Sequence, residues 1–533
     1  MRTALMLMTA SLPPLLGQTP GLRLFAPRQG DHTLLVDGNG ATVHSWTSSG
    51  SMVVHLDDDG NLLCGMVEPN SSFLGTTGRL QRRDVQDNLM WDLMVSDADR
   101  FMHHDICSLP NGNVLVMTVD RMTRSEAIAA GRDPALLTAT TWLPETILEI
   151  QQTGLTTGEV VWQWRVMDHI VQDFDPQLPN YGNVADHPGR VDINYPPHNL
   201  DVVGDWNHAN AIDYDPANDW IIISARDQNE CWIIDHSTTT AEAASNSGGL
   251  RQRGGDLIWR WGNPECYQRG GPGDQQLFQQ HDPRFIPPGC PGTGNITIFN
   301  NRALPQQSTV IEIDLPVDAS GNPFVDPTHN RFGPTGPVWS YTEPGFFSPY
   351  VSSAQRLRSG NTLICSGVNS TLLEVTPSGE TVWSYVHPAG GIIFQADAIE
   401  RRLWSNAKTL SVGNGGAVTL THIYDSARSG HMYYLLGSLA GTSPGYQCPS
   451  GLLLPLNPDT LFLGMLIYPN ATVFQNTLGA INPAGKASSA IIVPPNFLVP
   501  SLVGAEMNLS HILFDTAGYA DTASNVVTVK ITH

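Results

Sequence analysis

The sequence predicts an all-β protein, a six-bladed β-propeller followed by a β-sandwich domain. Two observations support this prediction. A strand–turn–strand pattern recurs along roughly residues 20–400, and the chain contains 50 Gly and 39 Pro but only 15% charged residues. Frequent Gly and Pro favour a turn-rich β protein over a helical one. The length agrees, because 533 residues exceed one ordinary core but suit a propeller with a second domain.

Each copy of the pattern has a strand with a polar start, a Gly-Asn turn, an apolar strand and a Trp-bearing strand. The clearest copy runs from His104 to Trp164, and another runs from Ser352 to Tyr385 in the same register. Gly-Asn and Asn-Gly turns supply the positive dihedrals of tight hairpins, and alternating apolar residues give each strand one buried face. Repeated four-stranded antiparallel units of this kind are typical of propeller blades.

Three further units complete most of the ring. Two looser copies span residues 208–261 and 281–341, and another lies around residues 51–91. Residues 33–46 form an incomplete unit that has outer strands only. We expect residues 392–403 to supply its inner strands, so that the two ends of the ring close together. This gives six blades, with five or seven as the alternative counts.

The first 17 residues have the pattern of a secretory signal peptide. Arg2 precedes a short apolar stretch that ends at Leu16, and this stretch is too short to span a bilayer. We therefore expect an exported protein, located in the periplasm, at the cell surface or outside the cell. No later segment is long and apolar enough to predict a membrane span.

The composition changes after Trp404, where the Trp-strand pattern stops and Lys and Arg become rare. Short strands continue to the end, so residues 18–404 are predicted as the propeller and residues 405–533 as a β-sandwich. The sandwich offers no catalytic cluster. We expect an accessory domain that attaches the protein to a surface, or a structural cap.

Charge and cysteine content narrow the classes of function. The formal net charge of −22 argues against nucleic acid or an anionic membrane as partner, but a local cationic pocket can still bind a small anion. The seven cysteines include no CxxC pair, which argues against zinc-finger and redox motifs. Cys266 and Cys290 flank a Gly-rich insertion, and a disulfide or two unpaired thiols are both compatible with the sequence.

Four polar motifs stand at the starts of predicted inner strands, where a propeller gathers side chains around its axis. A single strand His is usually structural, but three at equivalent repeat positions are expected to converge. Clustered imidazoles can act as nucleophile, as general acid and base, or as metal ligands. Arg226 favours an oxyanion over a cation. The motifs are His103-His104-Asp105, Asp205 to Asn210, Ser224 to Gln228, and Gln279 to Asp282.

The candidate catalytic residues are therefore His104, His208, His281 and Arg226. We expect nearby polar side chains to donate further hydrogen bonds to an anion bound by these residues. No metal or other cofactor is predicted. The candidate substrate-binding residues are His103, Asn210, Asn300 (with its neighbour Asn301 as the alternative) and Gln228.

Several of these segments resemble the bacterial arylsulfotransferase family, above all residues 205–216, 221–228, 255–264 and 280–282. The resemblance covers about residues 20–400. It implies an exported six-bladed propeller that moves a sulfuryl group from an aryl sulfate ester to a phenolic acceptor without the nucleotide donor PAPS. It also implies a transiently sulfurylated His in a ping-pong cycle. His208, His281 and Arg226 match the family motifs best.

Two positions depart from the family pattern. Asp227 stands where a His is expected. Ser352 or Ser353 stands at the register of His104, and if the nucleophilic His of the family belongs at this position, His104 or His281 must substitute for it, or the activity is changed or lost. Which His attacks therefore stays open. Two other functions also stay open: a non-catalytic anion- or ligand-binding propeller of the cell surface, and hydrolysis of sulfate esters. The sulfatase signature, Cys or Ser followed by x-Pro-x-Arg, is absent from the sequence.

Overall fold

The computed structural model describes residue 19 and residues 21–68, 75–196 and 204–533. The predicted signal peptide lies outside these ranges. The all-β prediction is confirmed, since antiparallel sheets make up most of the described chain and its helices are short. The helices are α1 (Arg124–Ala129), α2 (Thr240–Ala243) and α3 (Thr460–Ile467), and none in the described ranges is long and apolar enough to cross a membrane.

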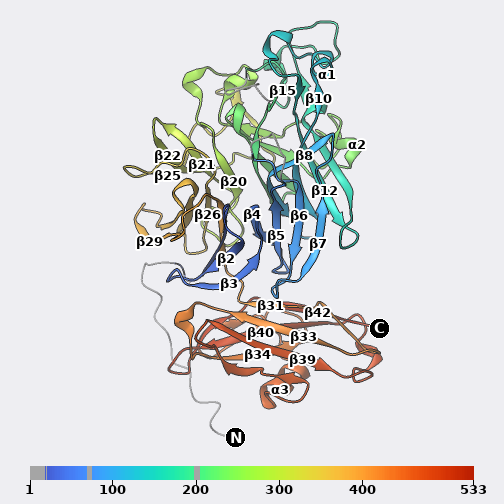
Figure 1. The fold of residues 1–533 in the computed structure, drawn as a ribbon, viewed down its shortest axis with the longest axis vertical. Helices are drawn as coiled ribbons and strands as arrows, with labels where there is room; N and C mark the ends of the chain where they lie inside the picture. Colours follow the sequence, from blue (N-terminus) through green and yellow to red (C-terminus); the bar gives the residue numbers. More distant parts are fainter. Residues whose placement is uncertain (1–18, 20, 69–74, 197–203) are drawn as a thin grey trace.

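Up to Ile399, the described residues contain six four-stranded antiparallel sheets, besides three short two-stranded ones (Figure 1). In sheet order, the first three are β30 (Ile393–Ile399), β1 (Leu22–Pro27), β2 (His32–Val36), β3 (Thr42–Thr47); β4 (Ser51–Leu56), β5 (Leu62–Met66), β6 (Arg79–Arg83), β7 (Leu89–Met94); and β8 (Arg100–Ser108), β9 (Val114–Asp120), β12 (Glu145–Gln152), β13 (Gly158–Arg165). The other three are β16 (Ala209–Asp215), β17 (Trp220–Ala225), β18 (Glu230–Asp235), β19 (Trp259–Trp261); β20 (His281–Phe285), β21 (Ile296–Leu304), β22 (Gln307–Ile313), β25 (Trp339–Tyr341); and β26 (Ser353–Arg356), β27 (Thr362–Ser366), β28 (Thr371–Val375), β29 (Thr381–Val386).

The six sheets form a closed ring. The first strand of each sheet contacts the first strands of its two neighbours, in the cyclic order β30, β4, β8, β16, β20, β26 and back to β30. The closing sheet combines three strands from the N-terminal end with β30 from the far end. The sequence interpretation expected more than one strand from the far end. It was wrong on that point, because the buried segment Leu22–Pro27 supplies the third strand instead.

The repeated Trp of the sequence pattern fastens each sheet to the next. In every sheet a Trp of the outermost strand donates its indole N–H to a backbone carbonyl of the following sheet or of the loop that leads to its outer strand. The six bonds are Trp46 to Asp84, Trp91 to Thr157, Trp164 to Gly255, Trp259 to Gly333, Trp339 to Pro377 and Trp383 to Gly38, with nitrogen–oxygen distances of 2.8, 3.0, 2.8, 2.9, 2.8 and 2.8 Å. The last bond returns to the first sheet, so the ring is closed at its rim as well as at its centre.

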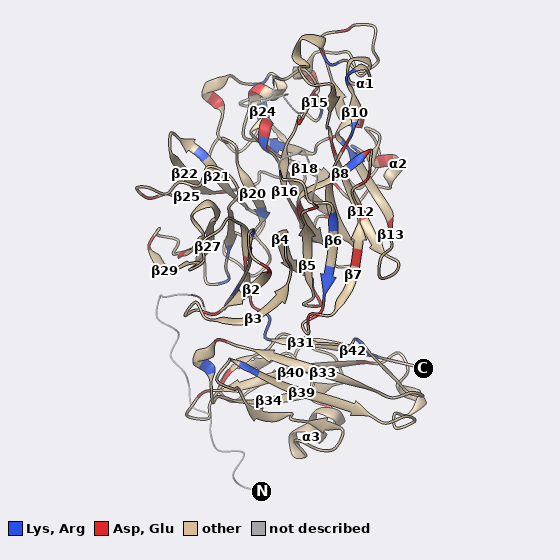
Figure 2. Ribbon diagram, viewed as in Figure 1, with Lys and Arg blue, Asp and Glu red and all other residues tan. Residues whose placement is uncertain are grey.

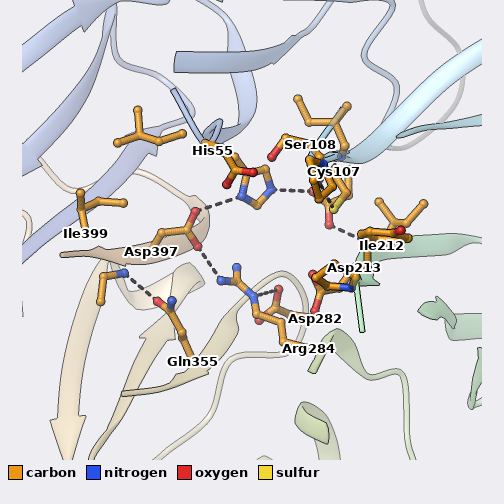
Figure 3. A pocket seen from close by; sticks show the side chains of 18 residues that line it. His55, Cys107, Ser108, Ile212, Asp213, Asp282, Arg284, Gln355, Asp397 and Ile399 are labelled. Atoms are coloured by element: carbon orange, nitrogen blue, oxygen red, sulfur yellow. Dashed lines mark hydrogen bonds and ion pairs between the residues drawn. The ribbon is translucent and has the colours of Figure 1, made fainter. Parts of the chain in front are cut away.

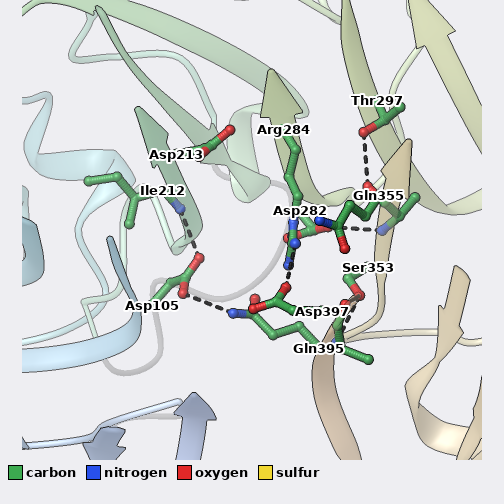
Figure 4. Close-up of polar contacts among 12 residues, drawn as sticks. Asp105, Ile212, Asp213, Asp282, Arg284, Thr297, Ser353, Gln355, Gln395 and Asp397 are labelled. Carbon is green, nitrogen blue, oxygen red and sulfur yellow. Dashed lines mark hydrogen bonds and ion pairs between the residues drawn. The ribbon is translucent and has the colours of Figure 1, made fainter. Parts of the chain in front are cut away.

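Polar side chains also join the innermost strands to one another (Figure 4). A carboxylate or amide oxygen accepts a backbone N–H of the next strand at four of the junctions: Asp105 from Ile212 at 3.0 Å, Asp213 from Phe285 at 2.8 Å, Asp282 from Ala354 at 2.9 Å and Gln355 from Ala398 at 2.7 Å. These bonds hold the strands that carry the candidate site residues at fixed positions around one axis.

A cavity of about 390 Å³ lies on that axis (Figure 3). His55 bridges Asp397 at 2.9 Å and Asp105 at 3.2 Å, and Arg284 pairs with Asp282 and Asp397 at 2.7 and 2.5 Å. Burial opposes the charge on His55, but the Asp397 and Asp105 carboxylates raise its pKa to about 10. The cations and carboxylates of this cavity therefore serve mainly to close the ring.

Two further sheets form the C-terminal part, with a shared apolar core between them. One holds β31 (Leu403–Ser405), β33 (Gly416–Ile423), β39 (Lys486–Val493) and β37 (Phe474–Gln475). The other holds β32 (Thr409–Ser411), β42 (Val527–Thr532), β40 (Glu506–Phe514), β34 (Met432–Ser438) and β38 (Leu478–Ala480), with β41 (Ala520–Ala523) beside β40. Since β31 begins at Leu403, this strand crosses the boundary predicted after Trp404.

The C-terminal sheets pack directly against the ring (Figure 1). Trp404 is buried in the same apolar cluster as Trp46 and Leu62 of the ring. Ser426 donates its hydroxyl to Asp37 at 2.5 Å, and Lys408 pairs with Asp59. Buried apolar packing and polar bonds both cross this boundary, so the two parts are joined by more than their linking chain.

Candidate active site

The candidate His residues stand where inner strands leave regular pairing. The register of β8 is interrupted between Met102 and Ile106, and that of β20 after His281. His104 and His208 adopt positive φ angles of 49° and 44°. Bulges re-aim side chains, and positive φ is costly for residues other than Gly, so neighbouring packing must hold these conformations. The imidazoles therefore point away from the paired strands and toward a shared space.

His104 and His208 meet in that space. Their ring centroids lie 4.7 Å apart at an interplanar angle of 70°, and both residues are buried or nearly so. Burial, together with the charges of His208 and His103, lowers the pKa of His104 well below its usual value. The His104 ring is therefore neutral near pH 7. A Cβ on Gly75 would lie only 2.1 Å from His104 Nε2, which means that backbone covers this nitrogen.

His208 is held in the opposite protonation state. Its Nδ1 forms an ion pair with Asp205. Burial opposes protonation, but the Asp205 carboxylate outweighs it and raises the pKa of His208 above its usual value. A protonated His208 can donate a proton to a leaving group and afterwards take one from an incoming group.

His103, a candidate substrate-binding residue, supports His104 from behind. The two Nδ1 atoms are 2.9 Å apart, and His103 Nε2 lies 2.9 Å from Glu145 Oε1 at the start of β12. His103 and Glu145 are both fully buried. A proton shared between His103 Nε2 and Glu145 leaves His103 Nδ1 as the acceptor, so that His104 Nδ1 is the donor between the two rings. Sequence reasoning missed Glu145, because it belongs to no motif.

His281 is fixed in one tautomer by its neighbours. Its Nδ1 lies 2.7 Å from Asn301 Oδ1, and its Nε2 accepts the backbone N–H of Val351 at 3.1 Å. An amide oxygen can only accept, so Nδ1 carries the proton and Nε2 the electron pair. Burial and the charge of Arg226 lower the pKa of His281 to about 3. This imidazole is therefore neutral at physiological pH and lies within electrostatic reach of the guanidinium.

Asn301, not Asn300, is the asparagine that reaches the cluster. Asn301 donates to the carbonyls of Ser348 and Val351 while its oxygen holds His281. Asn300 uses both ends of its amide on the backbone of Gln276 and Phe278. Asn300 instead fixes the backbone segment before β20. The role of Asn300 in substrate binding stays a prediction.

Arg226 lies in a short 3₁₀ turn, Arg226–Gln228, that follows β17. Its Nη1 is 2.6 Å from Asp227 Oδ1. Asp227 is 2% exposed, and burial raises the pKa of its carboxyl to about 6 against the opposing charges of His208 and Arg226. The departure noted in the sequence thus places a titratable carboxylate directly on the guanidinium that is expected to bind the anion.

Asn210 and Gln228 lie at the same end of the ring, both buried. Asn210 donates to the carbonyl of Gln280 at 2.9 Å, and Gln228 donates to that of Trp206 at 3.2 Å. Within the described ranges, Asn210 Oδ1 and Gln228 Oε1 have no hydrogen-bond partner. Buried polar atoms without partners are costly, so this end of the site is suited to water or to a polar ligand.

The serines at the register of His104 have structural roles. Ser352 donates to Ser348 Oγ at 2.9 Å and accepts the N–H of Gly367 at 3.0 Å. Ser353 accepts the N–H of Ala396 at 3.1 Å.

Cys266 and Cys290, whose pairing the sequence left open, are both unpaired thiols. Among the residues that the structure describes, no group of His, Cys, Asp or Glu has the geometry of a metal site.

The family model described as Arylsulfotransferase (ASST) matches residues 18–397. A search of curated proteins found no match.

Solved structures give weak similarities only. A protein of unknown function from Bacteroides caccae has 12% identity and a TM-score of 0.39, covering 72% of this chain and 100% of that one. The periplasmic gluconolactonase of Pseudomonas aeruginosa has 10% identity and a TM-score of 0.37, covering 72% and 99%. Virginiamycin B lyase from Staphylococcus aureus has 9% identity and a TM-score of 0.31, covering 70% and 86%. Similarities this low say nothing about the activity of this chain.

Proposed function

Because the chain belongs to the arylsulfotransferase family, we propose that it transfers a sulfuryl group from an aryl sulfate ester to a phenolic acceptor through a sulfohistidine at His281. The observation that carries this proposal is the fixed tautomer of His281. Asn301 holds the proton on Nδ1, so the neutral Nε2 keeps its electron pair, and Arg226 is near enough for its charge to lower the pKa of the ring. A nucleophile needs such an electron pair, and a bound sulfate needs such a cation.

The other two imidazoles fit the role of attacking group less well. Asp205 raises the pKa of His208 above its usual value, which favours the protonated ring, and that form has no free nitrogen electron pair. His104 is neutral, but the backbone of Gly75 covers its Nε2. His281 Nε2 accepts the Val351 N–H at 3.1 Å, and rotation of the ring toward the substrate would release this bond.

The first half of the proposed reaction forms an N–S bond and breaks the S–O bond of the donor. His281 Nε2 attacks sulfur, the electron pair of the S–O bond leaves with the aryl oxygen, and His208 donates its proton to that oxygen. The phenol then departs. In the second half His208 takes the proton of the acceptor phenol, the phenol oxygen attacks sulfur, and the N–S bond breaks to restore His281.

Charge stabilisation is assigned to Arg226 and to the Val351 N–H. The sulfuryl oxygens gain charge as the aryl oxygen leaves, and a guanidinium with a positioned backbone donor offsets that charge. Val351 is a β-branched residue at φ 52°, an uncommon conformation that Asn301 helps to hold through the Val351 carbonyl. Once His281 turns toward sulfur, the Val351 N–H becomes available to a sulfuryl oxygen.

The proposal extends to architecture and location. The closed cycle of inner-strand contacts and the six Trp bonds support six propeller blades, and the shared core of the C-terminal sheets supports a β-sandwich from about residue 405. We also propose that the protein is exported, with residues 1–17 as its signal peptide. Cleavage by the secretory pathway would produce a shorter chain than the sequence encodes, which mass spectrometry of the exported protein would detect.

The direct test is release of a chromogenic phenol from its sulfate ester, measured with and without a second phenol as acceptor. Release that depends on the acceptor, with formation of the sulfated acceptor, supports transfer. Release into water alone means hydrolysis, and binding of the ester without release means a non-catalytic anion-binding ring. His281→Ala should abolish transfer.

A further inference from the structure

Helix α3 lies on the side of the C-terminal sheets that faces away from the ring (Figure 1), and it forms part of an apolar tip. The tip consists of α3, the following Tyr468, and the hairpin of β35 (Tyr446–Gln447) and β36 (Leu453–Leu454). The hairpin lies against the helix, since the rings of Tyr446 and Phe462 have centroids 5.6 Å apart. Nothing proposed for the catalytic site uses this part of the molecule.

Helix α3 is apolar on both of its faces. Phe462 and Met465 point inward and are 2% and 0% exposed in the core between the two sheets. Its outer side and the tip hairpin carry large apolar side chains in water: Leu463 is 51% exposed, Leu466 43%, Ile467 61%, Tyr468 69%, Leu453 51% and Tyr446 37%. Clustered exposure of this kind on a soluble surface marks a binding surface.

The tip is also almost free of charge in a protein of net charge −22. Asp459 is the only Asp, Glu, Lys or Arg from Met432 to Gly485. Its carboxylate is turned inward as the cap of α3, where it accepts the N–H groups of Phe462 at 2.8 Å and Leu439 at 2.7 Å. Figure 2 shows α3 without a charged residue, whereas red and blue segments recur along the ring.

We propose that this tip inserts into the interface of a lipid bilayer that carries no net charge. The aliphatic side chains would enter the boundary between headgroups and acyl chains, and the two tyrosines would sit at headgroup level, where an apolar ring with a polar hydroxyl is favoured. The tip has no Lys or Arg to attract anionic lipid, and the charge of the whole protein opposes an anionic surface.

A second copy of the chain is a poorer occupant, because the tip is small. A helix of eight residues is about 12 Å long. A stable protein–protein interface usually buries more than about 1,000 Å² with matched shape, which a two-turn helix and a short hairpin do not offer. A bilayer needs no matched surface, so a few exposed apolar side chains on a rigid support suffice.

The experiment is sedimentation of the full-length protein with phosphatidylcholine vesicles, compared with the double variant Leu466→Glu/Ile467→Glu. Both side chains are exposed, so the fold should persist, and a thermal melt checks this. The single variant Ile467→Glu gives a second, milder test. Leu250→Glu is the matched control, because Leu250 is 72% exposed but lies in the ring. Size-exclusion chromatography with light scattering gives the mass of each protein in solution.

We expect the unaltered protein and Leu250→Glu to bind equally, the double variant to partition at least about tenfold less, and added phosphatidylserine to weaken binding. Failure of the unaltered protein to sediment with phosphatidylcholine would overturn the proposal, as would equal binding by the double variant. A dimer that Ile467→Glu converts to a monomer would assign the tip to a second copy instead. Sulfuryl transfer should be the same in all four proteins, so this test stands apart from that of the proposed function.

Discussion

Replacement of Asp227 by Asn tests how the site binds its anion. In the unaltered protein the Asp227 carboxylate pairs with Arg226 at 2.6 Å, so a sulfate ester must compete with it for the guanidinium. Protonation of Asp227 removes that competitor. Asn is close in size and uncharged, so the variant should bind the donor as if Asp227 were always protonated.

The expected magnitude follows from the Asp227 pKa of about 6. Burial raises this pKa above its usual value, so the carboxyl is mostly neutral below pH 6 and mostly ionised above it. The protonated fraction is about 0.9 at pH 5 and about 0.1 at pH 7, so KM for the donor should rise about tenfold between these values. Asp227→Asn should show a flat KM over the same range, about tenfold below the unaltered protein at pH 7.

Initial rates with a chromogenic aryl sulfate at a fixed phenol concentration provide the assay, with KM and kcat determined at half-unit steps from pH 5 to 7. His281 stays neutral across this window, because burial and the charge of Arg226 lower its pKa to about 3, whereas Asp205 raises the pKa of His208 above its usual value. Asp213 and Asp282, in the axial cavity, also have pKa values raised to about 6 by burial, but the variant leaves both unchanged. The same slope of KM with pH in both proteins would refute the reasoning.

Three more predictions follow from particular contacts. Glu145→Gln weakens the support of His103 and, through it, of His104, which packs against the proton donor His208, so it should lower kcat about tenfold with little change in KM; a change in KM alone would argue against this role. Trp91→Phe keeps an aromatic ring but deletes the bond to Thr157, and should lower the free energy of unfolding by about 1 kcal/mol or more in denaturant titrations. Stability should also fall as the pH drops from 6.5 toward 3: burial lowers the pKa of His422 to about 3 in the folded C-terminal sheets, whereas the unfolded chain takes up the proton near 6.5. At pH 5 this costs about 2 kcal/mol, and thermal melts of His422→Phe should show a correspondingly weaker dependence on pH.

The repeated sequence pattern was a useful guide to the sheets, because the same tryptophan hydrogen bond recurs in each of them. A Trp at the rim of each sheet donates to the next sheet, so the residue recurs at the spacing of the sheets and is visible in the sequence. The N-terminal strand Leu22–Pro27 carries no Trp or Gly-Asn turn of its own. It was missed for that reason, although it is fully buried.

The site was predictable in its residue types but not in its contacts. His104, His208 and His281 could be picked from the sequence because they stand near the starts of inner strands, which converge on one axis. Their hydrogen bonds could not be picked in the same way. The choice between Asn300 and Asn301 depends on which face of β21 meets His281, and adjacent residues on a strand face opposite ways. Glu145 reaches His103 from the third strand of its sheet, a contact that arises only from packing.

The central claim, a sulfuryl group carried on His281, is tested most directly by intact mass spectrometry. The protein would be mixed with an aryl sulfate in the absence of acceptor and quenched at once. The account predicts a mass increase equal to one SO₃ group, lost when a phenol is added, absent from His281→Ala, and retained in His104→Ala. An adduct that persists in His281→Ala and disappears in His104→Ala would contradict it.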